Sequence, residues 1–156
     1  MSYSRAIARC ITDYLDADDW NYQLDEQKEL IRMNLTLNNK MKKVHIIIDL
    51  RDDKYLVFMS YPLGADKDDS EQMIQMCDLL TRINYTLMFG CFEMDHRDGE
   101  VRFRLAVDCE DSLPSREIVK NSIMRAAGTC QKYGNAVVQV IMGVANGEEA
   151  FNASKN

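Results

Sequence analysis

From Trp20 to Pro62 the sequence alternates between apolar and polar residues with a period of two, and polar turns interrupt the alternation. A period of two is typical of strands that bury one face of a sheet. It predicts strands over residues 20–24, 31–37, 44–50 and 55–61, with turns at 25–28, 38–40 and 51–54. Connections this short pair neighbouring strands antiparallel, so we expect a meander.

Outside the meander the apolar residues recur with the period of an α-helix. The pattern predicts a helix over residues 3–17, a second helix that begins at the cap residue Asp69, and a long third helix that begins near Leu113. Asn146–Gly147 is a typical C-terminal cap, so the third helix is expected to end there.

Two more strands, over residues 88–95 and 101–109, are predicted between the second and third helices. The turn between them contains Asp98–Gly99, a strong hairpin signal. Helices that stand outside the runs of strands indicate an α+β fold with an antiparallel sheet. We expect one domain over residues 1–147 and a loose C-terminal tail over 148–156.

Charge and hydropathy exclude two classes of partner. The 156 residues include 25 Asp and Glu against 19 Lys and Arg, a net charge of −6. An acidic domain repels phosphate backbones, so we expect no nucleic-acid partner. Apolar runs such as Ile46–Ile48 are far shorter than the ~20 residues of a membrane span, so we expect no membrane segment. With no signal peptide recognisable at the N-terminus, a cytoplasmic location is predicted.

The sequence carries no motif of a catalytic or cofactor site. Gly-rich phosphate loops, a GxSxG elbow and an HExxH motif are all missing. The five cysteines and two histidines are scattered, without the spacing of metal ligands or of a disulfide framework. We therefore predict a protein that is not an enzyme and that needs no cofactor and no metal.

Both faces of the predicted meander are apolar at its centre. One face carries the stripe Val44, Ile46, Ile48, Leu50, Leu56 and Phe58, and the other carries Ile47, Tyr55, Val57, Met59 and Tyr61. A sheet covered on one side alternates cleanly, so the second face must be covered by a helix of the chain, by a second copy, or by a ligand or peptide. We predict that its five residues bind a protein partner or a second subunit in a homodimer.

A resemblance to a known family rests on two segments. Residues 80–95, LTRINYTLMFGCFEMD, are followed by Asp98-Gly99-Glu100-Val101-Arg102-Phe103-Arg104. This resembles the YbjN family of proposed bacterial sensory transduction regulators, in which a helix ends in Asn, a strand carries Gly-x-Phe, and an acidic-Gly turn leads into an Arg-Phe-Arg strand. The resemblance covers about residues 5–147.

The resemblance implies a fold like that of type III secretion chaperones: helix, three-stranded meander, helix, two strands, helix. This chain departs from that plan by an extra short strand over residues 20–24, or by one strand bent into two. The resemblance implies no catalytic residues. It favours a non-enzymatic, chaperone-like or regulatory module that binds a protein or peptide, commonly as a dimer. The alternative is a regulatory domain that senses a small ligand in a pocket between sheet and helices.

Overall fold

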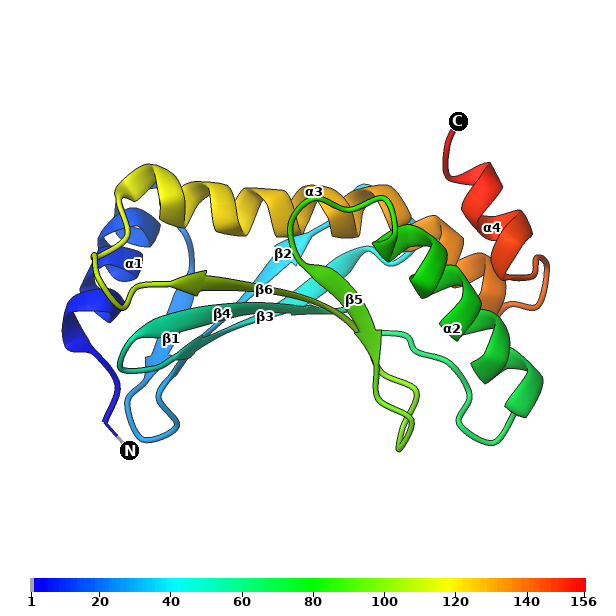
Figure 1. Ribbon diagram of the computed structural model, residues 1–156, viewed down its shortest axis with the longest axis horizontal. Coiled ribbons are helices and arrows are strands. Elements are labelled where there is room, and N and C mark those ends of the chain that lie inside the picture. Colours follow the sequence, from blue (N-terminus) through cyan, green and yellow to red (C-terminus); the bar gives the residue numbers. More distant parts are fainter. Residues whose placement is uncertain (1) are drawn as a thin grey trace.

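The computed structural model describes residues 2–156 and shows an antiparallel sheet with helices on one side (Figure 1). The helices are α1 (Arg5–Ala17), α2 (Ser70–Asn84), α3 (Arg116–Ile141) and α4 (Gly147–Ala153). The strands are β1 (Tyr22–Asp25), β2 (Leu30–Thr36), β3 (Lys43–Leu50), β4 (Lys54–Ser60), β5 (Cys91–Met94) and β6 (Val101–Asp108). The predicted α+β fold class is confirmed.

The sheet has the strand order β1-β2-β3-β4-β6-β5, and every neighbouring pair is antiparallel. Strands β1 to β4 are the meander, and the β5–β6 hairpin adds to it through β6. In Figure 1, α3 runs along one side of the sheet, α1 lies near one end and α2 near the other. No helix covers the opposite side in that view. We call this uncovered side the open face.

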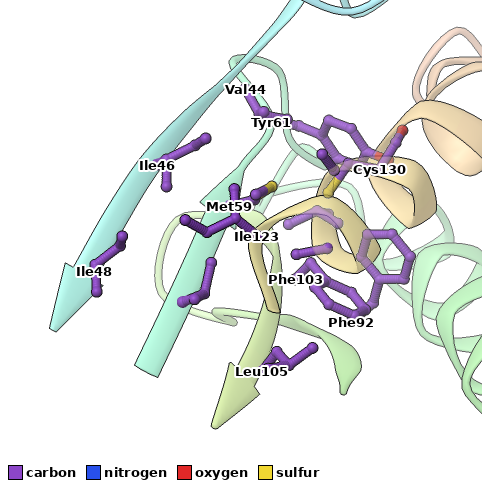
Figure 2. Packing of buried hydrophobic residues seen from close by; sticks show 14 of the residues in the cluster. Val44, Ile46, Ile48, Met59, Tyr61, Phe92, Phe103, Leu105, Ile123 and Cys130 are labelled. Carbon is purple, nitrogen blue, oxygen red and sulfur yellow. The ribbon is translucent and has the colours of Figure 1, made fainter. Parts of the chain in front are cut away.

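The core lies between the sheet and α3. Ile46, Met59 and Phe103 occupy neighbouring positions on β3, β4 and β6, and all three are buried. Figure 2 shows Ile123 and Cys130 of α3 among these side chains. Full burial of an aliphatic or aromatic side chain stabilises a fold by about 1.5–3 kcal/mol, so this layer is the main source of stability.

The face assignment predicted for β4 is wrong. Residues opposite each other in an antiparallel pair point to the same side of the sheet. Tyr55 is paired with the core residue Leu50. By the same register Val57 and Met59 also point into the core, as does Tyr61, and all four side chains are buried. For these residues the cover is the chain's own helical layer, and of the five predicted interface residues only Ile47 lies on the open face.

The reason is the geometry of the β3–β4 turn. The Arg51 N–H donates to the Lys54 carbonyl at 3.0 Å, so the turn has two residues, and position 50 must face position 55. The sequence pattern of β4 could not reveal which side is core, because the run Tyr-Leu-Val-Phe-Met is apolar on both sides of the strand. Leu56 and Phe58, predicted in the core stripe, therefore point to the open face.

The C-terminal segment is also different from the prediction. Asn146 is an N-cap: its side chain accepts from the Glu149 N–H at 2.8 Å, while the Glu149 carboxylate accepts from the Asn146 N–H at 3.1 Å. This reciprocal pair begins a helix. Residues 148–153 are therefore not a loose tail but belong to α4, where Gly147 and Ala150 are buried.

Candidate protein interface

The open face carries an apolar strip at its centre. Ile47 on β3 lies opposite Phe58 on β4. Leu56, two residues before Phe58 on β4, points to the same side of the sheet. Ile47 is 36% exposed, and the other two side chains are partly exposed. An aliphatic and aromatic strip left in water by the chain's own fold is a typical contact surface for another molecule.

A hollow of about 660 Å³ lies at the β1–β3 end of the strip. Its lining includes Arg32, Asn34, His45 and Ile47, whose register places them on the open face. His45 Nδ1 and Asn34 Oδ1 are 2.6 Å apart, which orients both side chains. The hollow therefore combines an apolar wall with groups that donate and accept hydrogen bonds, as a binding site for a polypeptide requires.

At the other end of the strip, two arginines share one carboxylate. Arg102 Nε is 2.7 Å from one Glu93 oxygen, and Arg104 Nε is 3.3 Å from the other. The Arg102 guanidinium carbon also lies 4.2 Å from the centre of the Phe58 ring, a cation–π contact that covers part of it. The open face thus has an apolar centre with charged groups around it, the usual composition of a protein interface.

Two of the predicted interface residues instead attach the sheet to α3. The Tyr61 hydroxyl donates to the Cys130 carbonyl at 2.7 Å. Because the Ser122 hydroxyl donates to the Val119 carbonyl at 2.7 Å, the Tyr55 hydroxyl donates to Ser122 Oγ at 2.8 Å. Burial raises the pKa of Tyr55 to about 12 and raises the pKa of Tyr61 well above its ordinary value.

Leu56, Phe58, Arg102 and Arg104 were not recognised as surface candidates from sequence. The sequence predicted a turn over residues 51–54 but not the hydrogen bond that closes it, and this bond is what places position 50 opposite position 55. The arginines alternate with buried residues along β6, so their side of the sheet follows from β6 alone. Only the β4–β6 pairing shows that they flank the Phe58 side of β4.

The Asn and Gly of the family motif close the loop between α2 and β5. Asn84 Nδ2 donates to the Phe92 carbonyl at 2.9 Å, and the Phe92 N–H donates to Asn84 Oδ1 at 2.7 Å. The Asn84 amide thus acts as a strand partner at the edge of the sheet. Gly90 has φ +73°, and a Cβ there would lie 2.6 Å from the Phe103 ring. Asparagine and glycine are therefore needed for geometry at this loop.

Comparison with known proteins agrees with this motif. The model of the YbjN family, described as "Putative bacterial sensory transduction regulator", matches residues 9–139. The chain belongs to the YbjN family. None of the curated proteins matches this family member in sequence.

Two solved structures share the fold of this YbjN-family chain. The crystal structure of YbjN from E. coli, described as a "putative transcription regulator", has a TM-score of 0.58 at 11% identity and covers 88% of this chain and 90% of its own. The HopA1–SchA chaperone–effector complex contains a chain with a TM-score of 0.52 at 11% identity. The match covers 83% of this chain and 93% of that chain. The predicted likeness to type III secretion chaperones is confirmed at the level of the fold. Among the described helices, none is long and apolar enough to cross a membrane.

Proposed function

We propose that this YbjN-family protein is a non-enzymatic, chaperone-like module that holds a polypeptide segment of a partner protein on its open face. The observation that carries the proposal is the apolar strip of Ile47, Leu56 and Phe58 on the uncovered side of the sheet. A chain of the same fold occurs in a chaperone–effector complex, which supports a chaperone-like role. The family description supports a regulatory use of such binding.

The open face has the two kinds of group that a polypeptide client needs. Apolar side chains of the client would contact the strip, gaining about 25 cal/mol for each Å² of apolar surface removed from water. Arg32, Asn34 and His45 around the hollow supply hydrogen-bonding groups for the client backbone. Because no step of this interaction breaks a covalent bond, the module needs no catalytic residues.

Suppression of aggregation tests the proposal. A denatured model enzyme is diluted into buffer with the protein, and light scattering follows its aggregation. We expect the wild type to suppress scattering and Ile47→Asp to lose this effect. Ile74→Asp is the matched control, because Ile74 is 59% exposed on α2, away from the open face. Failure of the wild type to suppress, or equal loss in both variants, would contradict the proposal.

A second copy of the chain is the other occupant that suits the open face, and the homodimer remains a prediction. Burial of the strip in a two-fold contact would remove it from water. Light scattering after size exclusion should then give twice the single-chain mass of 18.0 kDa for the wild type, and the single-chain mass for Ile47→Asp. A wild-type mass near 18.0 kDa at micromolar concentration would contradict a dimer.

The alternative of a ligand pocket between sheet and helices gains no support from the geometry. Core side chains such as Met59, Phe103 and Ile123 occupy that space (Figure 2). The hollow of about 660 Å³ lies instead on the open face. Binding of a polypeptide is therefore the function that we propose.

A further inference from the structure

The loop between α2 and β5 presents apolar side chains to solvent beside α3. Met88 is 89% exposed and Phe89 is 52% exposed. With Arg125, Gly128 and Lys132 of α3 they line a groove of about 410 Å³, which we call the α3 groove. Figure 1 shows the loop rising beside α3, on the helical side of the sheet. The groove is therefore a surface separate from the open face.

The backbone of this loop is closed at its base. The two hydrogen bonds between Asn84 and Phe92 join its ends, and Gly90 with its positive φ fits against the Phe103 ring. Such closure gives the loop a defined path. The exposure of Met88 and Phe89 is thus a property of the folded loop and not of a frayed chain end.

The charges at the α3 groove are all positive, although the protein carries a net charge of −6. The Arg125 guanidinium carbon lies 4.0 Å from the centre of the Phe89 ring, and Lys132 Nζ lies 5.2 Å from the centre of the Tyr133 ring. Within residues 2–156, neither cation forms an ion pair with a carboxylate. Two cations in contact with aromatic faces are therefore available to an anionic ligand.

Gly128 leaves a gap in the wall that α3 contributes. A Cβ built on it meets nothing within 4 Å among residues 2–156, so no contact with them requires a glycine. Glycine in a helix interior costs about 1 kcal/mol relative to alanine. At Gly134, by contrast, a Cβ would lie 2.3 Å from the Asn39 side chain, which explains that glycine by packing. A bare helix backbone at Gly128 lets a bound chain approach closely.

We propose that the α3 groove binds an acidic segment of a partner protein that also carries apolar side chains. One apolar side chain would lie between Phe89 and Gly128, and carboxylates on either side of it would pair with Arg125 and Lys132. Charge complementarity carries this assignment, because the only charged groups in the groove are cations. The proposal concerns a second binding surface and does not depend on the open face.

An acidic peptide fits these observations better than an anionic membrane or a nucleic acid. Both of those are extended polyanions, and they would repel the net charge of −6 elsewhere on the protein. The groove is also concave, with a volume suited to one or two side chains and not to a flat bilayer surface.

The experiment measures the fluorescence anisotropy of labelled helical peptides mixed with the full chain. The probe has a row of leucines along one face, with glutamates on both sides of that row. A second peptide replaces the glutamates with lysines, and a third replaces the leucines with serines. We expect the first peptide to bind at least about tenfold more tightly than the other two, since loss of one charge pair or one apolar anchor costs about a factor of ten.

One double variant and two controls locate the site on the chain. Arg125→Glu with Lys132→Glu should weaken binding of the acidic peptide about tenfold or more. Arg116→Glu with Lys120→Glu changes the net charge equally on the same helix outside the groove and should leave the affinity within about twofold. Ile47→Asp on the open face should also leave it unchanged, so failure here is distinct from failure of the chaperone-like function.

Gly128→Leu separates binding from folding. Leucine should raise helix stability and fill the groove, so the melting temperature should not fall while affinity for the acidic peptide drops about tenfold. Equal weakening by the two charge-reversal doubles, equal binding of the lysine peptide, or unchanged binding by Gly128→Leu would overturn the proposal. Binding of the wild type to phosphatidylglycerol–phosphatidylcholine vesicles without binding to the acidic peptide would also overturn it.

Discussion

The hydroxyl of Tyr61, the residue directly after β4, donates a hydrogen bond of 2.7 Å to the Cys130 carbonyl in the middle of α3. A second tyrosine, Tyr55 of β4, donates to Ser122 two turns earlier on the same helix. The two bonds give α3 a defined position along the sheet. They also explain why these tyrosines, which look like surface candidates in the sequence, are core residues.

We predict that alkaline pH destabilises the fold through these tyrosines. Burial raises the pKa of Tyr55 from 10.0 to about 12, so between these values the folded state keeps a proton that the unfolded state has lost. The free energy of unfolding should be unaffected by Tyr55 below pH 10. It should then fall by up to about 1.4 kcal/mol per pH unit as pH rises to 12.

Urea unfolding of the wild type and Tyr55→Phe isolates this effect. The stability difference between them should be constant from pH 7 to pH 9 and shrink by about 1 kcal/mol by pH 11, since phenylalanine has no proton to lose. A difference that stays constant up to pH 11 would disprove the assignment.

Two glycines of α3 should respond in opposite ways to alanine. At Gly134 a Cβ would lie 2.3 Å from Asn39 Nδ2, and this side chain donates to the Gln131 carbonyl at 3.0 Å. Gly134→Ala should therefore cost about 1–3 kcal/mol. The methyl group of Gly128→Ala meets no neighbour in the described part of the chain, so this variant should be more stable by up to about 1 kcal/mol. Chemical denaturation measures both, and equal effects would contradict the packing described here.

Lysine substitutions distinguish the two sides of the sheet. Val57 is fully buried, and Val57→Lys should destabilise by about 3 kcal/mol or more because it buries an unpaired charge. Ile47→Lys, on the neighbouring strand but on the open face, should change stability by less than about 1 kcal/mol. Urea melting checks both variants, and a small effect at Val57 would show that the register is wrong.

The Asn84 amide should be necessary for the edge of the sheet. Asn84→Ala leaves the N–H and C=O of Phe92 without these partners, so we expect a loss of about 1–3 kcal/mol despite the better helix propensity of alanine. Asn152→Ala, at an exposed position of α4, is the control and should change stability by less than about 0.5 kcal/mol. Thermal melts of both variants give the comparison, and equal stabilities would contradict the role of Asn84.

Local signals predicted much of this structure correctly. The period of two located the meander, and Asp98–Gly99 located the β5–β6 hairpin, where Gly99 has φ +80°. The predicted cap Asp69 accepts from the Gln72 N–H at 3.0 Å and begins α2. Each of these features depends on residues a few positions apart, so the order of the amino acids is sufficient to specify it.

The candidate surfaces depended on contacts between distant residues. The α3 groove joins Phe89 to Arg125, and α4 docks where the Gly147 N–H donates to the Gln75 side chain at 2.9 Å. The period of apolar residues in the sequence cannot predict such contacts, because segments far apart in the chain meet only when the whole core is packed.

The amino-acid sequence by itself determined the order of the elements as far as α3, the antiparallel pairing of the meander and the family motif of Asn84 and Gly90. Only the tertiary structure decided which side of β4 is core, because that strand is apolar on both sides. The pairing of Leu50 with Tyr55 and the position of α3 bury Val57 and Met59, and leave Leu56 and Phe58 to the open face.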